Sequence, residues 1–465
     1  MLKRLFGPLI TLCDKVVFFL VVGPVCAILL FILLLRRVTI NLPNNKKKKR
    51  VLCLNPMRWE WVEEKGILSH VMLLNHGDYW DHFFLIHADA LNDRKITVSK
   101  TITVLEFNAQ KPTLLSRLGF KALKRVLREI NFLKQMVSFV KENEIDVIRS
   151  QEPYRAGMRG VILRQLTGCP LVEDIRCNYD LVYQNTGVTA LGKTGILYRG
   201  IEKCVERITF RYADMVFGGN NDNRDFGIYN GANPQKTFTV RPVGVSEKHF
   251  EDVSLRKNLR EELNLVGRKV MLCLSRLSLE KYPQDAVQCA ALVCQGHDDA
   301  ILLMVGDGVM RDKLQELAMD LGIREKVRFL GFQPENRVID LLYTADAIIS
   351  CLTGSALIEA ALSTTPIVAY DFEWHSELIK DGETGILVPF RDYKCLANAV
   401  VKVLENDELA KRLGKSAREL AIGQHHPDVV ALQEHKCFER LFRGDLLPRK
   451  LDEQENNWPT IEGER

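Results

Sequence analysis

Two positively charged residues follow a predicted strand in the second half of this 465-residue chain. The apolar run 270–275 is typical of a buried strand, Arg276 comes directly after it, and Lys281 lies five residues further on. Arginine can form two hydrogen bonds to one phosphate group, and lysine adds a second positive charge. The pair is therefore suited to stabilise a diphosphate leaving group. The alternative is that both residues are solvated surface cations near a loop.

Five further residues could bring backbone groups close to the same anion, because they lie in turns after predicted strands: Gly306, Asp307, Gly308, Gly354 and Ser355. Glycine lets a ligand approach the main chain, and free N–H groups at a helix start favour phosphate. The first three form only a short Gly-x-Gly turn, so an ordinary strand–helix connection is the simpler interpretation for them. The other two begin a predicted helix at 356–362 and could bind a phosphate there.

One acidic residue could bind the sugar of a nucleotide. Glu359 lies four residues after Ser355, and its carboxylate could accept hydrogen bonds from both ribose hydroxyls. Phe332 and Gln333 follow the predicted strand 327–330, where their backbone could contact the edge of a base. A structural glutamate and a plain turn are the alternatives for these two features.

Short apolar runs alternate with amphipathic stretches along most of the chain, which indicates parallel, doubly wound α/β sheets. In the first half we predict strands at 51–55, 70–75, 95–100, 145–149, 171–175 and 215–217, and helices at 114–127, 130–141 and 198–212. In the second half we predict strands at 270–275, 300–305, 327–330, 347–349 and 367–369. The helices expected there are 283–295, 311–321, 335–343, 356–362, 393–406 and 407–413.

The two halves are predicted to be separate Rossmann-like domains that are joined near 239–245. We expect a first domain at 46–245 and a second at 246–425. A helix at 426–443 is expected to cross back to the first domain, and 444–465 to form a flexible tail. Ligands of open parallel sheets bind at the carboxyl ends of the strands, so the active site is expected in a cleft between the domains.

The first 45 residues are predicted to anchor the chain in a membrane. Residues 16–35 contain no charged side chain, and about 20 helical residues span roughly 30 Å, the thickness of a bilayer core. A signal peptide usually has a shorter core, and a buried core helix is the remaining alternative. More cations follow the stretch than precede it, which predicts a single-pass protein with its other domains in the cytosol. The basic run 46–50 could contact anionic lipid headgroups or be a solvated flank.

Overall composition excludes several classes of protein. Hydrophobic residues make up 46% and charged residues 26%, which is typical of globular chains and excludes a largely disordered one. The net charge of +5 is too small for a dedicated nucleic-acid-binding protein. The 12 cysteines show no zinc-site spacing, and several lie in apolar runs, so they are predicted to be small buried hydrophobic residues.

Taken in order, the motifs of the second half resemble those of glycosyltransferase family 4, the retaining nucleotide-sugar transferases of GT-B fold. The similarity covers most of residues 215–442. Its motifs are RPVGVSEKHF at 241–250, SRL with a lysine at 275–281, LLMVGDG at 302–308, FLG at 329–331, ADA at 345–347 with EA at 359–360, TPIVA at 365–369, and ELI with DGETGILVP at 377–389. Shorter similarities, PLVEDIR at 170–176 and ADM at 213–215, precede the joint.

The resemblance implies a GT-B fold with an acceptor-binding first domain and a nucleotide-sugar-binding second domain. It implies that Arg276 and Lys281 stabilise the departing diphosphate and that Glu359 holds ribose. The turns at 306–308, 332–333 and 354–355 would contact the donor. The implied activity is that of a retaining, hexosyltransferase-type glycosyltransferase that uses a nucleoside-diphosphate sugar and needs no cofactor and no metal ion.

Four positions depart from the family pattern: Val243 and Ser246 replace the usual Asn and Asp of the joint motif, and Cys351 and Tyr282 differ in the motifs of the site. The family has a glutamate near the donor sugar, eight residues before the position of Glu359, but this chain has Cys351 there. Glu373 or His375 could contact the sugar instead, although ordinary loop residues are the favoured interpretation. Tyr282 stands where the family has glycine. The loss of the first glutamate leaves the sugar open and favours, as one alternative, an inactive binding or scaffold protein.

Acceptor recognition is expected in the first domain, which carries no family motif before about residue 144. Glu152 and Arg176 end predicted strands, so Glu152 could help to deprotonate an acceptor hydroxyl, with structural salt bridging as the favoured alternative for both. The anchor favours an acceptor at the membrane, a lipid or lipid-linked saccharide, over a soluble one. The resulting hypothesis is a membrane-anchored, cytosol-facing glycosyltransferase, and a sugar-nucleotide epimerase of the same fold is a further alternative.

Overall fold

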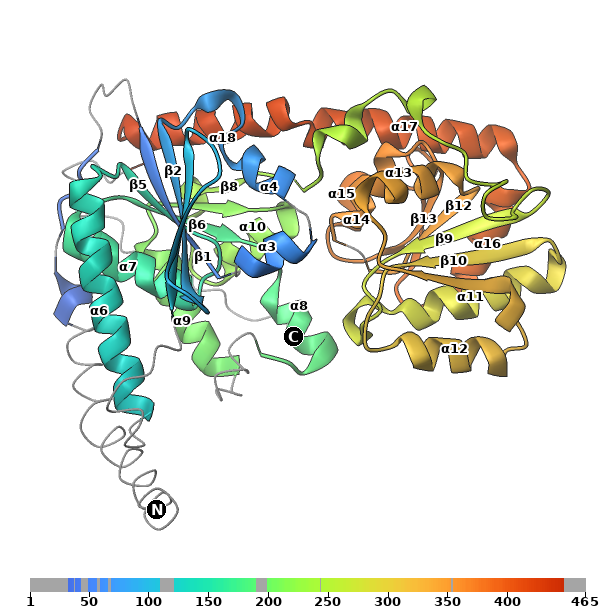
Figure 1. The fold of residues 1–465 in the computed structure, drawn as a ribbon, viewed down its shortest axis with the longest axis horizontal. Helices are drawn as coiled ribbons and strands as arrows, with labels where there is room; N and C mark the ends of the chain where they lie inside the picture. The colour runs from blue at the N-terminus through green and yellow to red at the C-terminus, as the bar shows by residue number, and fades with distance from the viewer. Residues whose placement is uncertain are drawn as a thin grey trace, which may run out of the picture.

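The computed structural model describes residues 32–36, 38–42, 49–56, 59–65, 68–108, 121–189, 199–242, 244–352 and 354–446. These residues form two α/β domains that lie side by side, the first drawn in blue to green and the second in yellow to orange (Figure 1). Each contains one largely parallel sheet with buried clusters on both of its faces. The architecture is therefore the doubly wound arrangement expected from the alternation of apolar runs and amphipathic stretches.

The first domain is built on an eight-stranded sheet in the order β3-β4-β2-β1-β5-β6-β7-β8. Its strands are β1 (Arg50–Asn55), β2 (His82–Ala90), β3 (Arg94–Thr97), β4 (Ile102–Asn108), β5 (Val147–Ser150), β6 (Leu171–Ile175), β7 (Met215–Gly218) and β8 (Thr237–Thr239). β3 runs antiparallel to β4, whereas the other described strand pairs of this sheet are parallel. Successive residues of β1 are buried because helices cover both faces.

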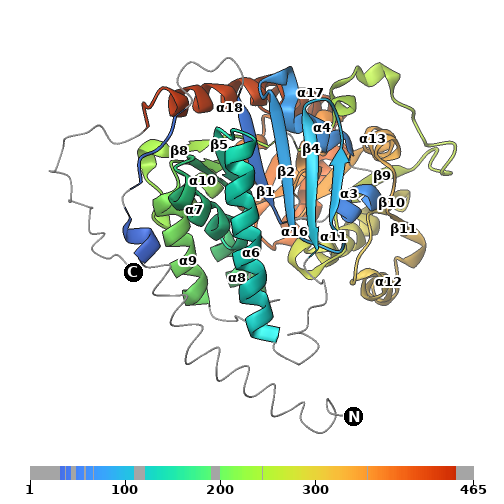
Figure 2. The same ribbon diagram turned by 60° about the vertical axis from the view of Figure 1, so that its left-hand side comes forward.

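Helices pack on both faces of this first sheet. They are α3 (Trp59–Lys65), α4 (Leu68–Met72), α6 (Lys121–Glu142), α7 (Arg155–Thr167), α8 (Tyr179–Thr186), α9 (Arg199–Tyr212) and α10 (Asn221–Tyr229). Phe132 of α6 shares a buried cluster with Leu52 of β1, and Figure 2 shows α6 beside the strands. Trp59 of α3 shares a second cluster with Val51 on the opposite face.

The first half of this domain departs from the sequence prediction. The strand predicted at 70–75 is wrong, because the chain forms α4 and the 3₁₀ segment η2 (Leu73–Asp78) there. The Asn75 side chain donates to the Trp80 carbonyl and accepts from the Trp80 N–H, both at 2.9 Å, so side-chain bonds fold a turn that an apolar pattern does not reveal. β2 and β4 were not predicted, because polar residues interrupt their apolar runs. The helices predicted at 114–127 and 130–141 are one helix from Lys121 onward, and 114–120 lie outside the described residues.

The second domain contains a six-stranded parallel sheet in the order β11-β10-β9-β12-β13-β14. Its strands are β9 (Lys269–Leu274), β10 (Ala300–Val305), β11 (Val327–Gly331), β12 (Ala347–Ser350), β13 (Ile367–Asp371) and β14 (Ile386–Pro389). Its helices are α11 (Pro283–Gly296), α12 (Arg311–Asp320), α13 (Glu335–Thr344), α14 (Ala356–Leu362), α15 (His375–Leu378), α16 (Tyr393–Leu404) and α17 (Asp407–His425). The elements predicted here agree closely, but β14, α15 and the second half of α17 were not foreseen.

The C-terminal helix returns to the first domain. α17 lies on the second domain, and α18 (Pro427–Phe442) continues along the first, as the red helices at the top of Figure 1 show. The Phe438 ring lies 4.8 Å from the Trp80 ring and 5.6 Å from the Phe217 ring. Glu434 forms a 2.9 Å ion pair with Arg149 of β5. The last helix of the chain is therefore part of the core of the first domain.

The predicted membrane anchor at 16–35 lies mostly outside the described residues, as does the tail from 447 onward. Within the part of the chain that the structure describes, no helix has the length and apolar character needed to cross a bilayer. Residues 32–36 lie against the first domain. The Gln165 side chain donates to the Leu33 carbonyl at 3.0 Å, and the Tyr212 hydroxyl donates to the Leu34 carbonyl at 2.8 Å. The end of the N-terminal stretch is thus attached to α7 and α9.

Candidate active site at the domain junction

Three neighbouring strands of the second domain end at one edge of the sheet. β9, β12 and β13 are adjacent and parallel, so the loops after them lie close together. Arg276 and Lys281 follow β9, Gly354 and Ser355 follow β12, and Glu373 follows β13. The 3₁₀ segment η7 (Leu279–Lys281) also contacts α8 of the first domain. The predicted phosphate-binding residues therefore lie where the two domains meet.

Lys281 is a partly buried cation at this junction. In the described parts of the chain, its ammonium group forms neither an ion pair nor a hydrogen bond. Burial lowers the pKa of Lys281, and the nearby Glu373 acts in the opposite direction. Arg276 is 67% exposed and pairs with Glu280 at 3.5 Å. Arg276 and Lys281 repel each other, and Lys281 forms no ion pair with a described residue, so an anionic ligand would stabilise the arrangement.

Tyr282 holds Lys281 in place through an aromatic and charged network. Its φ of 51° is in the left-handed region, where the family motif has glycine and where other residues are strained. Its buried ring lies 4.3 Å from the Arg391 guanidinium and 5.4 Å from the Phe390 ring. Arg391 in turn forms a 2.9 Å ion pair with the buried Asp285. Packing of the ring offsets the strained backbone and fixes the turn that carries Lys281.

Gly306 and Gly308 allow two loops of the protein to touch. A side chain at Gly306 would place its Cβ 2.0 Å from the Ser275 carbonyl oxygen, and one at Gly308 would lie 2.4 Å from the Leu277 oxygen. The Leu277 N–H donates to the Asp307 carbonyl at 3.0 Å. The close approach observed is thus between main chains, and it positions the loop that carries Arg276. The Asp307 carboxylate is exposed and pairs with Arg311 at 3.1 Å.

Phe332 and Gln333 form the turn that ends β11. The Phe332 side chain is 65% exposed, and the Gln333 side chain donates to the Leu330 carbonyl at 2.5 Å. The Gly306 N–H donates to the Gly331 carbonyl at 2.9 Å, which joins this turn to the Gly306–Gly308 turn. Of the residues predicted to contact a base, Phe332 thus presents a large exposed ring next to the other loops that are predicted to bind the sugar donor.

Glu359 is a partly buried carboxylate on α14. Burial and the nearby Glu335 raise the pKa of Glu359 to about 7. The His249 Nε2 atom lies 3.9 Å from the Glu359 carboxylate. Glu335 begins α13, directly after the turn that contains Phe332 and Gln333. The structure therefore brings the predicted ribose-binding residue next to the predicted base-binding turn.

Gly354 and Ser355 are exposed residues in front of α14. A Cβ at Gly354 would meet no described atom within 4 Å, so the space around this residue is open. A Cβ at Gly244, in the joint between the domains, would lie 3.5 Å from the Ser355 Cβ. α14 has only seven residues, so a helix dipole contributes little here, and Lys281 and Arg276 supply the main positive charge.

Cys351 does not face the domain junction. Its side chain is buried in the core cluster that contains Cys273 and Cys289, and burial raises its pKa well above the usual range. His375 is also fully buried, with its Nδ1 atom 3.0 Å from the Tyr370 carbonyl oxygen. Glu373, by contrast, lies within electrostatic range of Lys281 and of Asp222 in the first domain. Of the two proposed replacements for the missing glutamate, only Glu373 lies at the junction.

Glu152 and Arg176 occupy different environments on the first domain. The Glu152 carboxylate accepts hydrogen bonds from the Tyr154 and Ala156 N–H groups at 3.1 and 2.5 Å, at the start of α7. Burial raises the pKa of Glu152 despite these bonds. The Arg176 side chain is 38% exposed and pairs with Asp174 at 3.0 Å. Arg176 is therefore more accessible to a ligand, whereas Glu152 caps a helix.

Glu377 links the two domains and was not identified from the sequence as a functional residue. Its carboxylate accepts hydrogen bonds from the Asn221 and Asp222 N–H groups at the start of α10, at 2.7 and 3.4 Å. It also forms a 3.0 Å ion pair with Arg241 of the joint. The partners lie far apart along the chain, so no local pattern could have revealed this contact. Glu377 therefore fixes the relative position of the loops that carry Glu373 and Asp222.

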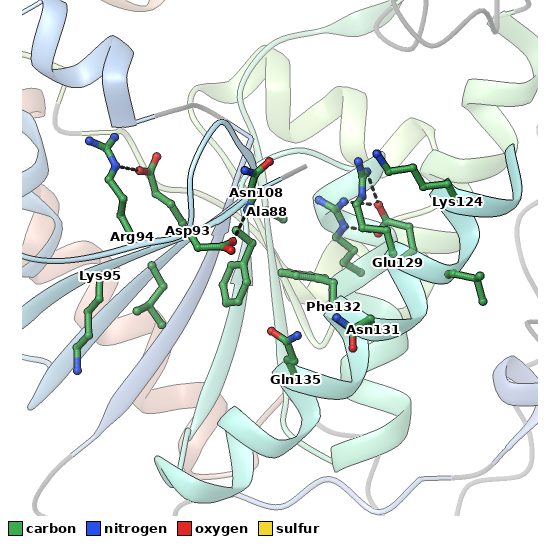
Figure 3. Close-up of a pocket in the computed structure, with 16 residues that line it drawn as sticks. Ala88, Asp93, Arg94, Lys95, Asn108, Lys124, Glu129, Asn131, Phe132 and Gln135 are labelled. Carbon is green, nitrogen blue, oxygen red and sulfur yellow. Dashed lines mark hydrogen bonds and ion pairs between the residues drawn. The ribbon is translucent and has the colours of Figure 1, made fainter. Parts of the chain in front are cut away.

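A separate pocket of about 790 Å³ lies in the first domain, between the β3–β4 strands and α6 (Figure 3). Its lining combines the apolar rings of Phe107 and Phe132 with several ion pairs. Arg94 pairs with Glu106 at 2.5 Å, and Arg159 pairs with Glu129 at 2.7 Å. Its two walls are joined by residues 109–120, which lie outside the described residues, and we assign no ligand to it.

Comparison with known proteins finds a family model that matches most of the second domain. Residues 256–420 match the family model of glycosyl transferases group 1. α-D-Kanosaminyltransferase of Streptomyces kanamyceticus is 29% identical over 183 residues, which cover 38% of this chain and 47% of that protein. α-Monoglucosyldiacylglycerol synthase of Streptococcus pneumoniae is 26% identical over 277 residues, which cover 58% and 61%. The match thus spans about half the length of these relatives.

Solved structures resemble this chain over both domains. Sucrose-phosphate synthase of Thermosynechococcus elongatus is 19% identical, with a TM-score of 0.68, over 85% of this chain and all of the other. HepE of Anabaena, in a complex with UDP and glucose, is 18% identical, with a TM-score of 0.63, over 84% and 99%. At this identity the likeness shows the fold alone. The chain has the GT-B-like α/β fold of glycosyltransferases, as the sequence resemblance implied.

Proposed function

We propose that this protein is a retaining glycosyltransferase of family 4 that moves a sugar from a nucleoside-diphosphate sugar to an acceptor. The observation that carries the proposal is Lys281, a partly buried cation beside Arg276 that forms no ion pair or hydrogen bond with the described residues. The match of residues 256–420 to glycosyl transferases group 1 supports it. HepE, which shares the fold, was solved with UDP and with UDP-glucose.

The proposed residues divide the task of holding the donor. The bond between the sugar C1 and the diphosphate oxygen breaks, and the acceptor hydroxyl bonds to C1 on the same face of the sugar. Lys281 and Arg276 stabilise the negative charge that develops on the departing diphosphate, which is the largest electrostatic demand of the reaction. Glu359 accepts hydrogen bonds from the ribose hydroxyls, and the turn at Phe332 and Gln333 contacts the base. The proton of the acceptor hydroxyl is transferred to water or to a nearby base.

A lipid or lipid-linked acceptor at the membrane is the second part of the proposal. The relatives include a glucosyldiacylglycerol synthase and a phosphatidylinositol mannoside mannosyltransferase of Mycobacterium tuberculosis, 27% identical over 210 residues. The charge-free stretch 16–35 supports a single membrane span with the catalytic domains in the cytosol. Residues 32–36 contact the first domain, so a span ending there would hold that domain close to the bilayer. Arg176 is the accessible candidate for an acceptor contact.

The proposed reaction uses no metal ion and no cofactor. The positive charge of Lys281 and Arg276 takes the role that a divalent cation has in other nucleotide-sugar enzymes. Activity should therefore persist in EDTA.

The decisive experiment is an assay of the full-length protein in detergent with a panel of nucleotide sugars and a membrane lipid extract. Release of nucleoside diphosphate that requires one donor and the lipid, and that is lost in Lys281→Ala and Glu359→Ala, supports the proposal. The anomeric configuration of the product then tests retention. Nucleotide binding without turnover would favour an inactive scaffold protein, and conversion of the donor sugar without an acceptor would favour an epimerase.

A further inference from the structure

Glu373 occupies the strand end next to the one that carries Cys351. β12 and β13 pair in parallel from Ile348 with Ile367 to Ser350 with Ala369, so the residues that follow both strands lie at the same edge of the sheet. Cys351 turns into the core after β12. After β13, Glu373 lies within electrostatic range of Lys281 and of Asp222 across the junction. The Glu373 carboxylate thus lies near Lys281, the proposed diphosphate-binding cation. It follows β13, whereas the first glutamate of the family motif would follow the neighbouring strand β12.

The backbone at Glu373 is strained, and its neighbours hold it there. Its φ of 51° is in the left-handed region, which residues other than glycine adopt at a cost. Phe372, on one side, stacks on Phe390 with ring centroids 3.9 Å apart and an angle of 11°. His375, two residues further along the chain, is buried against the Tyr370 carbonyl. The packing of Phe372 and His375 therefore holds the backbone of Glu373 in this strained conformation.

The carboxylate of Glu373 does not compensate this strain with contacts of its own. In the portion of the chain that the structure describes, it forms neither a hydrogen bond nor an ion pair, and Lys281 is not within ion-pair distance of it. Burial raises the pKa of Glu373, so part of its hydration is lost as well. Strained backbone conformations are concentrated at active sites and ligand-binding sites. The acceptor atoms of Glu373 are therefore available to a ligand that also satisfies Lys281.

We infer that Glu373 binds hydroxyl groups of the transferred sugar while Lys281 holds the attached diphosphate. This inference rests on the proposed function. A sugar diphosphate carries hydroxyl groups, which donate hydrogen bonds, within a few ångströms of an anion. The hydroxyl groups match the Glu373 carboxylate, and the anion matches the Lys281 ammonium group. Glu373 would thus select the sugar. It would add to the binding affinity of a sugar nucleotide but not to that of the free nucleoside diphosphate.

The test is nucleotide binding by the full-length protein, measured by calorimetry. UDP, GDP and ADP are titrated first, followed by the glucose, galactose, mannose and N-acetylglucosamine derivatives of the nucleotide that binds. We expect Glu373→Gln to weaken binding of the preferred sugar nucleotide tenfold or more, because a charge-assisted hydrogen bond is lost. Binding of the free nucleoside diphosphate should change less than twofold. Asp371→Asn, an exposed carboxylate two residues earlier, is the matched control and should change neither.

Glu373→Gly protects the test against misfolding, because glycine adopts a φ of 51° without strain. This variant should unfold at a higher temperature than the wild type and show the same selective loss of sugar-nucleotide binding. Parallel weakening of both ligands would overturn the inference, since Glu373 would then act through Lys281. Unchanged binding of both ligands would overturn it too. If the wild type binds no nucleotide, the proposed function fails and this inference fails with it, whereas the other two outcomes leave the proposed function standing.

Discussion

Nucleotide affinity should depend on pH through one carboxylate, Glu359. Burial and Glu335 raise its pKa from 4.5 to about 7 in the unliganded protein. Ribose hydroxyls donate hydrogen bonds, so they favour the ionised carboxylate, and nucleotide binding should release a proton below pH 7. At a pKa of about 7 the group is about 90% ionised at pH 8 and about 3% ionised at pH 5.5. If binding requires the ionised form, affinity should fall about 30-fold between these two pH values.

The assay compares the wild type with Glu359→Gln. Nucleoside diphosphate is titrated from pH 5.5 to 8 in two buffers that differ in ionisation enthalpy, so that proton release is measured with affinity. The phosphate of the ligand titrates near pH 6 in both proteins, and the ratio of their affinities therefore isolates Glu359. Glu335→Gln removes the charge that helps to raise the pKa of Glu359, so it should move the midpoint to lower pH. A ratio that is constant with pH, or that favours the wild type in acid, would refute the reasoning.

The same pKa has a consequence for the unliganded protein. Between the unfolded value of 4.5 and the folded value of about 7, the folded state binds more protons at Glu359 than the unfolded state. The free energy of unfolding should therefore decrease as pH rises through this window. The side chain is 21% exposed, and we expect Glu359→Gln to be more stable than the wild type by about 1–2 kcal/mol at pH 8. The two proteins should be nearly equal at pH 4.5, as chemical denaturation at both pH values would show.

Substitutions at three residues of the domain junction and its loops should have measurable effects on binding or stability. Lys281→Met should weaken nucleoside diphosphate binding about 10- to 100-fold in calorimetry, because a charge-assisted contact is lost, whereas the exposed Lys380→Met control should bind normally. Glu377→Ala should lower the free energy of unfolding by about 2–3 kcal/mol, because it removes the acceptor of two α10 N–H groups. It should also increase the radius of gyration in X-ray scattering. An unchanged radius would mean that other contacts fix the two domains. Gly306→Ala should lower the free energy of unfolding, measured by chemical denaturation, by more than about 2 kcal/mol, because its Cβ would lie 2.0 Å from a carbonyl oxygen. Gly354→Ala, with open space around it, should be tolerated. Equal stabilities of the two variants would contradict the loop contact.

Much of the second domain was predictable because its strands are buried on both faces. Such strands appear as continuous apolar runs, and β10 was predicted to the residue. The first domain was less predictable, since β2 carries polar residues within its run and the segment near Asn75 folds through side-chain bonds to Trp80. These are interactions of individual side chains with particular backbone groups, and hydrophobic periodicity contains no information about them.

The candidate site divides in the same way. Arg276 and Lys281 were identified because residues that follow a parallel strand lie at its carboxyl end, whatever the rest of the fold does. The orientation of a side chain after the strand is a different matter. Cys351 turns into the core and Glu373 turns to the junction because their loops pack against α11 and against Phe390, respectively. The carboxylate of Glu377 finds its partners 155 and 156 residues away.

The amino-acid sequence by itself determined the alternation of strands and helices in the second domain, the strand ends that carry the cations, and the charge-free N-terminal stretch. These features depend on local hydrophobic pattern and on the order of residues along a strand. The tertiary structure alone decided which charges form no ion pair among the described residues, which loops touch, and which carboxylate lies near Lys281. Such properties depend on burial and on distances between residues remote in the chain, and they arise only when two domains and a returning C-terminal helix pack together.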